Sequence, residues 1–193
     1  MKAKFNWKII PAAAAYILLF VLCSSCGLMH PACYAYAGTL MPLLGAFIYL
    51  FACSEMQCFG AAAALNGILL AVGIITGEGN PPLLIGLFLI SLLSEFIRNK
   101  NGYDSIKGVR KSFIPFAYSF YAYSAHWWTD TAGSLAEAVE EMPAGYAEKM
   151  ETVIGNIPML IVMLVLTVPV AVAGIRIAEK VLKKQTGKSK EKD

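Results

Sequence analysis

The sequence is dominated by long apolar runs that carry no charge. Between Ile9 and Thr76 the only ionisable side chains, apart from cysteines and tyrosines, are His30 and Glu55. The 193-residue chain is 58% hydrophobic and only 15% charged, with a mean hydropathy of +0.60. A soluble domain of this size could not bury so much apolar surface, which excludes a cytoplasmic enzyme, a nucleic-acid-binding protein and a disordered tail protein. The composition therefore predicts a protein of the lipid bilayer.

Six of these runs approach the length needed to cross a bilayer as helices. A hydrocarbon core about 30 Å thick requires roughly 20 helical residues at about 1.5 Å each. The runs are continuous rather than alternating, which favours helices over barrel strands because a helix satisfies its own backbone hydrogen bonds in lipid. The predicted fold class is therefore all-α, a polytopic membrane protein. Its six predicted transmembrane helices are residues 9–29, 33–52, 56–76, 83–97, 112–128 and 157–181.

The basic residues indicate how these spans are oriented. Fifteen of the sixteen lysines and arginines lie before the first span, between the fourth and fifth spans, or after the sixth, and only Lys149 lies on the other side. Basic loops stay cytoplasmic, so both termini are predicted to be cytoplasmic and the chain is expected in the plasma membrane. Pro11 and the lack of a clear cleavage site favour a retained first helix over a signal peptide. The predicted domains are a six-helix membrane domain, 1–184, and a charged cytoplasmic tail, 185–193.

The acidic segment 129–155, between the fifth and sixth spans, is predicted to be external and to contain two short helices. Ser134 followed by Glu137 resembles a capping box and predicts a helix that runs to about Met142. A second helix is predicted over 146–154, where Gly155 ends it. Such helices lie on the membrane surface or cover a cavity that opens outward.

The outer end of the fifth span carries a candidate ligand site. Tyr123, His126, Trp127 and Asp130 recur at i, i+3, i+4 and i+7, which puts them on one face if the helix persists. Flat apolar rings with a few polar groups are typical of small-molecule pockets, although tryptophans and tyrosines here are equally consistent with an interfacial aromatic belt. The predicted substrate-binding residues are Tyr123, His126, Trp127, Trp128, Asp130, His30, Glu78, Asn80 and Asn66.

Two polar side chains interrupt the predicted spans. Asn66 lies in the middle of the third span, where it either forms an interhelical hydrogen bond or contacts a ligand. Glu95 lies near the cytoplasmic end of the fourth span, three residues before Arg98. A carboxylate within a membrane is a functional candidate, but an i, i+3 ion pair or snorkelling to the interface favours a structural role.

A cysteine cluster offers an alternative to the small-molecule site. Its members, which could hold zinc or copper, are Cys23, Cys26, His30 and Cys33. Cys23 and Cys26 could equally form a thiol–disulfide pair, but apolar filling is favoured for the cysteines because the chain has no second Cys-x-x-Cys motif. No P-loop, dinucleotide-binding fingerprint, zinc-protease helix or serine-hydrolase elbow is present. We therefore expect that the chain is not an enzyme and that it needs no cofactor.

The segment from Ser94 to Val153 resembles a known family. It reads SEFIRNKNGYDSIKGVRKSFIPFAYSFYAYSAHWWTDTAGSLAEAVEEMPAGYAEKMETV, and the basic end AGIRIAEKVLKKQ follows later. Both stretches are similar to the Trep_Strep (MptS-like) family of integral membrane proteins, which are regarded as substrate-binding S components of energy-coupling-factor (ECF) transporters. The resemblance implies a protein that captures a micronutrient, such as a vitamin or related metabolite, from outside the cell. It also implies docking on a transmembrane coupling subunit driven by two ATPases, and toppling in the bilayer to release the cargo inside.

The resemblance further implies a docking surface of small residues on the first helix. S components commonly present an Ala-x-x-x-Ala pattern there, whereas Tyr16 and Ile17 stand four residues after the first two alanines of this chain. Small residues also allow close packing within one subunit, so both interpretations stay open. The predicted docking residues are Ala12, Ala13, Ala14 and Ala15.

Overall fold

The computed structural model describes residues 7–189, with side chains described for residues 7–182. Every regular element in this part of the chain is helical, which confirms the predicted all-α fold. Lys2 and Lys4, which contribute to the predicted sidedness, lie outside the described residues. The helices are α1 (Ile9–Ser25), η1 (Cys26–Leu28), α2 (Pro31–Ala35), α3 (Ala37–Leu40), α4 (Pro42–Glu55), α5 (Ala61–Ile75), α6 (Pro81–Asn101), α7 (Ile106–Phe116), α8 (Ser119–Ser124), α9 (His126–Thr129), α10 (Thr131–Glu141), α11 (Tyr146–Ile154) and α12 (Ile157–Ser189).

Within this range, three helical stretches are long and apolar enough to cross a membrane. They are Ile9–Leu28, Pro81–Asn101 and Ile157–Leu182, and the shorter helices α4 and α5 are also apolar. The last helix continues to Ser189, so the predicted domain boundary after residue 184 does not coincide with a helix end. The structure thus contains apolar helices of membrane-spanning length, while the count of six spans stays a prediction.

The second and fifth predicted spans are broken helices rather than continuous ones. The second run consists of α2, α3 and α4, and α4 begins at Pro42, which has no N–H to donate to a preceding turn. The fifth run consists of α7, α8 and α9, with Pro115 one residue before the end of α7. The backbone leaves helical dihedrals at Tyr36 and Tyr118, so side chains beyond these two residues no longer follow the spacing of one straight helix.

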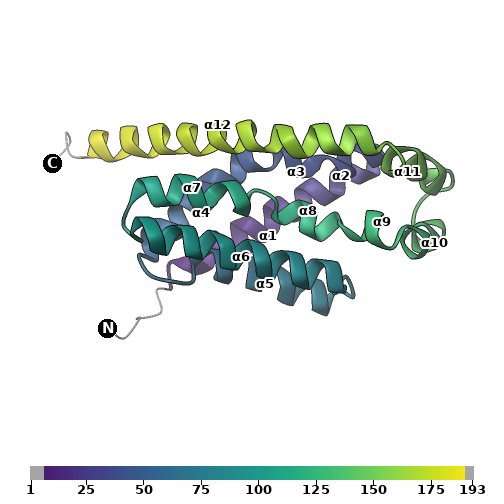
Figure 1. Ribbon diagram of the computed structural model, residues 1–193, viewed down its shortest axis with the longest axis horizontal. Helices are drawn as coiled ribbons and strands as arrows, with labels where there is room; N and C mark the ends of the chain where they lie inside the picture. Colours follow the sequence, from purple (N-terminus) through teal and green to yellow (C-terminus); the bar gives the residue numbers. More distant parts are fainter. Residues whose placement is uncertain (1–6, 190–193) are drawn as a thin grey trace.

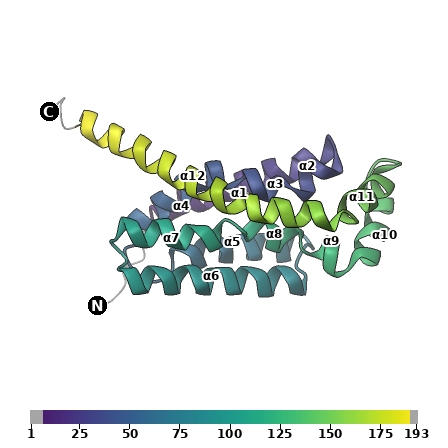
Figure 2. The same cartoon turned by 45° about the horizontal axis from the view of Figure 1, so that its top comes forward.

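The helices are arranged lengthwise, so the molecule has two distinct ends (Figure 1). The start of α1 and the end of α12 lie at one end, together with the basic connection between α6 and α7. The short helices α10 and α11 lie at the other end, which we call the lid end. The second view shows the same separation, with α12 running along the bundle toward the lid end (Figure 2).

Two glycines allow helices to approach closely within the bundle. A Cβ added at Gly86 of α6 would lie 2.6 Å from the Cβ of Ala122 in α8. A Cβ added at Gly174 of α12 would lie 2.7 Å from the carbonyl oxygen of Pro42 at the start of α4. Close backbone approach is a main source of helix association in lipid, where burial of apolar surface adds little.

A buried ion pair organises the end of α6 that lies opposite the lid end. Glu95 and Arg98 are 1% and 0% exposed, and Arg98 Nη1 lies 3.5 Å from Glu95 Oε2. The Glu95 carboxylate also accepts a hydrogen bond from the Ala62 N–H at 2.7 Å, while Arg98 donates to the Met56 carbonyl at 2.7 Å. The predicted pairing of Glu95 with Arg98 is confirmed, and the pair also ties down the connection between α4 and α5.

The lid helices form as predicted, but α10 begins earlier than the capping box suggested. Asp130 caps it by accepting a hydrogen bond from the Gly133 N–H at 3.2 Å, so the helix starts at Thr131. The predicted N-cap at Ser134 is therefore wrong, because Asp130, four residues earlier, already satisfies a free N–H of the first turn. Helix α11 spans Tyr146–Ile154, which confirms the second predicted helix.

Candidate functional site

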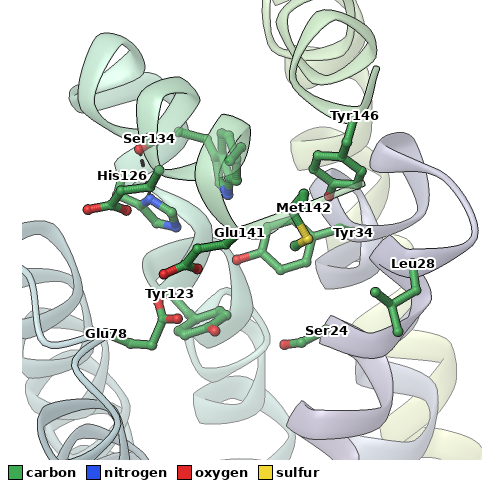
Figure 3. Close-up of a pocket in the computed structure, with 13 residues that line it drawn as sticks. Ser24, Leu28, Tyr34, Glu78, Tyr123, His126, Ser134, Glu141, Met142 and Tyr146 are labelled. Atoms are coloured by element: carbon green, nitrogen blue, oxygen red, sulfur yellow. Dashed lines mark hydrogen bonds between the residues drawn. The ribbon is translucent and has the colours of Figure 1, made fainter. Parts of the chain in front are cut away.

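A cavity of about 170 Å³ opens at the lid end (Figure 3). Its walls come from α1, α2, α8, α9, both lid helices and the turn between α5 and α6. The lining residues are Ser24, Leu28, Tyr34, Glu78, Tyr123, His126, Trp127, Ser134, Glu137, Ala138, Glu141, Met142 and Tyr146. Four of the predicted binding residues, Glu78, Tyr123, His126 and Trp127, are therefore brought together around one space.

An aromatic wall forms one side of the cavity. The ring of Tyr34 meets the rings of Tyr123 and Trp127 edge to face, with centroids 6.3 and 6.2 Å apart. Phe20 and Phe120 support this wall, because their rings lie 5.9 and 5.8 Å from the Tyr123 ring. Such packing holds the wall rings in one orientation, so a ligand meets a preformed surface.

Two ring nitrogens at the cavity lack ordinary hydrogen bonds. His126 Nδ1 lies 2.9 Å from the Ser134 hydroxyl, which joins α9 to α10. His126 Nε2 and Trp127 Nε1 are buried and form no hydrogen bond of standard geometry within the described part of the chain. The Trp127 N–H can only donate, whereas His126 Nε2 donates or accepts according to the tautomer that Ser134 selects. Both atoms are enclosed in the cavity wall, where the Tyr34 hydroxyl lies beside the Trp127 N–H.

Three carboxylates line the cavity from its solvent-exposed mouth. Glu137 and Glu141 lie one turn apart on α10, and Glu78 faces them from the turn between α5 and α6. Figure 3 shows Glu78 and Glu141 extending toward the Tyr34 and Tyr123 side of the cavity. Partial burial raises the pKa of Glu78, and the nearby charges of Glu141 and Glu137 raise it further. Among the described lining residues there is no lysine or arginine, so the mouth is negatively charged.

A second, largely apolar cavity of about 260 Å³ adjoins the first. It lies between α1 and α5 and shares Ser24, Glu78 and Tyr123 with the first cavity. These three side chains therefore separate a polar aromatic chamber from an apolar one.

Three predicted binding residues serve instead as helix caps. His30 Nδ1 accepts a hydrogen bond from the Ala32 N–H at the start of α2. Asn80 Oδ1 accepts one from the Leu83 N–H at the start of α6, and Asp130 caps α10. None of these three lines the cavity, because a cap must direct its side chain at its own helix.

Two further predicted residues also lie outside the cavity. Trp128 Nε1 donates to the Ile154 carbonyl at 3.2 Å and ties the end of α9 to α11. Asn66 is buried in the bundle, where it accepts a hydrogen bond from the Tyr16 hydroxyl at 3.2 Å and donates to the Ser91 hydroxyl at 3.0 Å. Asn66 therefore forms interhelical hydrogen bonds and does not line this cavity.

The structure does not assemble the alternative cysteine site. The described residues include Cys23, Cys26, His30 and Cys33, yet they contain no group of three or more histidine, cysteine or acidic side chains placed to hold a metal ion. His30 uses Nδ1 as a helix cap, and the Cys26 thiol donates to the Leu22 carbonyl at 3.3 Å. The cysteines are free thiols, with Cys23 partly buried and Cys26 and Cys33 exposed.

The alanines at the start of α1 divide between two faces. Ala12 and Ala13 are each 4% exposed and pack inside the bundle. Ala14 and Ala15 are exposed on the outer face of the helix. Only the latter two are therefore accessible to another protein.

Sequence reasoning missed several residues of the cavity. Tyr34 lies inside a run that was predicted as one plain spanning helix, and nothing in its spacing related it to Tyr123. Glu137 and Glu141 carried a usable signal, because their i, i+4 spacing puts both carboxylates on one face of a predicted lid helix.

Comparison with known proteins identifies the family of this chain. No curated protein and no solved structure matches it. Residues 9–188 match a family model described as a hypothetical bacterial integral membrane protein (Trep_Strep). Since the match covers nearly the whole chain, including the cavity and both lid helices, the protein belongs to the Trep_Strep family of bacterial integral membrane proteins.

Proposed function

We propose that this protein is the substrate-capturing membrane subunit of an ECF-type importer and has no catalytic activity of its own. The observation that carries the proposal is the aromatic cavity beneath the lid helices, at the end of the bundle opposite the start of α1. Concave sites with aromatic walls and a few polar atoms are typical of small-molecule binding. In this proposal the lid end is extracellular, both termini are cytoplasmic, and the protein resides in the plasma membrane.

The core below the cavity supports a binding role rather than a channel. Stacked aromatic rings fill the space beneath the wall: Phe20 and Phe120 have centroids 5.3 Å apart, and Tyr16 and Phe116 lie 5.4 Å apart. Tyr49 continues this column, 4.4 Å from Phe116. In the described part of the chain these rings lie between the cavity and the opposite end of the bundle, so we infer that release of a ligand to the other side requires movement of the subunit.

Such movement needs an energy source on another chain. We infer a transmembrane coupling subunit and two ATPase subunits as partners, in line with the family resemblance. The exposed small residues Ala14 and Ala15 on α1 are the docking positions that we assign to the coupling subunit. Small side chains suit this role because they let a partner helix approach closely in lipid.

Copurification from native membranes tests this proposal. The tagged chain is expected to bring down a coupling protein and an ATPase pair, identified by mass spectrometry, and to mediate substrate uptake only with them. Ala15→Leu should reduce recovery of the coupling protein, whereas Gly67→Leu, at a position with open space around it, should not. Recovery of no such partners, together with no bound small molecule, would falsify the proposal.

A further inference from the structure

The charge at the mouth of the cavity restricts the kind of ligand that can enter. Glu78, Glu137 and Glu141 line the opening, and the described lining residues include no lysine or arginine to neutralise them. A negative potential at a concave mouth concentrates cations and repels anions. An anionic ligand would have to approach three carboxylates without a counter-charge, so a cation is favoured.

The spacing of these carboxylates favours an organic cation over a metal ion. A bound divalent ion needs several ligand atoms within about 2.0–2.6 Å of one point. The described residues contain no group of three or more acidic, histidine or cysteine side chains placed in that way, and the three glutamates are among them. The carboxylates act on one another electrostatically without converging, as expected for groups that surround a larger cation.

The aromatic wall supplies a second, independent feature that suits a cation. Tyr34 meets Tyr123 and Trp127 edge to face, at interplanar angles of 62° and 74°, so the three rings that line the cavity are not parallel to one another. Ammonium groups bind to ring faces through the ring quadrupole, and several rings around one cation form an aromatic cage. Trp127 is 6% exposed, so its ring is held in a desolvated environment where this attraction is stronger.

The ring nitrogens of the wall are buried and do not face the ligand. Trp127 Nε1 and His126 Nε2 have almost no exposed surface, and the Tyr34 hydroxyl lies beside the Trp127 N–H. The charge of the ligand and its contact with the rings therefore carry its recognition. The cavity of about 170 Å³ has room for several water molecules and hence for a small amine.

We propose that the cavity binds a small organic cation, an inference that rests on the proposed function. The ammonium group lies against Tyr34, Tyr123 and Trp127, within the field of the three glutamates. The proposal deepens the function because it names the chemical class of the substrate.

Pairs of isosteric probes test the charge requirement directly. Binding of choline and its neutral isostere 3,3-dimethylbutan-1-ol, and of benzylammonium and benzyl alcohol, is measured by calorimetry on the purified full chain in lipid nanodiscs. We expect the cation of at least one pair to bind more than tenfold more tightly than its neutral partner. Equal binding within both pairs, or no binding of either cation at millimolar concentration, would overturn the proposal.

Charge-removing variants with a matched control localise the effect. Glu137→Gln and Glu141→Gln should each weaken binding of the cationic probe by about fivefold, the size of one unit charge acting across about 4 Å in a solvent-like dielectric. Glu140→Gln removes an equal charge from the same helix at a position that does not line the cavity, and it should leave the affinity unchanged. Equal weakening by all three variants would show a general surface field instead of a site.

Ring variants separate the cation–π contribution from simple packing. Tyr123→Phe retains the ring face and should bind the cationic probe nearly as well as the wild type, whereas Tyr123→Leu should bind it several-fold more weakly. The affinity for benzyl alcohol should fall less between the same two variants.

The results distinguish failure of this inference from failure of the proposed function. If the coupling partners are recovered but the cationic and neutral probes bind equally well, only the proposal of a cationic substrate is wrong. If the cationic probe binds but no coupling module is recovered, only the transporter role is wrong.

Discussion

The His126 imidazole and the Ser134 hydroxyl meet 2.9 Å apart, and this contact joins the cavity wall to the lid. His126 comes from α9 and Ser134 from the second turn of α10, so the contact spans the turn at Asp130. Both residues line the cavity, and Ser134 is 5% exposed. The lid is therefore anchored to an imidazole of the cavity wall.

Removing the Ser134 hydroxyl should loosen the lid. Ser134→Ala leaves His126 Nδ1 without its partner in a partly buried position, which costs about 1–3 kcal/mol. We expect a lower melting temperature in detergent and faster amide hydrogen exchange in α10. Ser25→Ala is the matched control, because that hydroxyl is exposed and bonds only within α1. Unchanged exchange in α10 of Ser134→Ala would show that the contact does not hold the lid.

The adjacent tryptophans Trp127 and Trp128 should respond differently to substitution. Trp127 lines the cavity, whereas Trp128 donates to the Ile154 carbonyl and packs against the lid helices. Trp127→Ala should therefore weaken binding of a cationic probe strongly. Trp128→Phe should lower the melting temperature through the lost hydrogen bond and leave the affinity near that of the wild type. The reverse order of affinities, measured by calorimetry, would move the site away from this cavity.

Binding of a cation should weaken as the pH falls through the pKa of Glu78. Burial and the neighbouring Glu141 and Glu137 raise that pKa, so Glu78 takes up its proton at a higher pH than an ordinary glutamate with a pKa of about 4.3. Since only the ionised carboxylate attracts a cation, the loss of affinity begins at a higher pH than for an unperturbed glutamate. The titratable groups around Glu78 at the cavity are Glu137 and Glu141 of α10, His126 of α9, Tyr34 of α2, Tyr123 of α8 and Tyr146 of α11.

The stability of the unliganded protein should change with pH in the opposite direction to its affinity for a cation. Because the pKa of Glu78 is higher in the folded protein than in the unfolded chain, ionising it costs folding free energy as the pH rises through that interval. Glu78→Gln should therefore reduce the pH dependence of affinity and leave the unliganded protein at least as stable at neutral pH. Calorimetry and thermal unfolding across pH 4–7 check both signs. An affinity profile identical to that of the wild type would exclude Glu78 as the titrating group.

Close helix packing at Gly86 should be sensitive to a single methyl group. In Gly86→Ala the new Cβ would lie 2.6 Å from the Ala122 Cβ, so α6 and α8 must separate at a cost of about 1–3 kcal/mol. Gly67→Ala is the control, because a Cβ at that position of α5 meets nothing within 4 Å. It should retain or raise the melting temperature, since alanine is the better helix former. Equal destabilisation by both variants would argue against a specific contact between α6 and α8.

Periodicity and turn residues in the sequence were sufficient to predict the helical fold, apolar helices of membrane-spanning length and two lid helices. These features depend on neighbours in the chain: an apolar run must be helical in lipid, and glycine or proline ends a short helix. The prediction of an N-cap at Ser134 was wrong because two capping motifs lie close together in the sequence, and Asp130 is the residue that caps α10. Likewise, His30 and Asn80 were chemically suitable ligands but are used as caps.

The candidate site itself was decided by the tertiary structure. Tyr34 and Tyr123 come from different apolar runs, and Glu78 and Glu141 come from the turn between α5 and α6 and from the lid, so only the packing of these elements brings the four side chains around one cavity. A straight helix would have kept Tyr123, His126, Trp127 and Asp130 on one face, but the redirected backbone retains the first three around the cavity and turns Asp130 to its own helix. Sequence spacing specifies which side chains share one helix face, whereas a cavity needs faces of several helices to converge, and that depends on the breaks and packing distances between them.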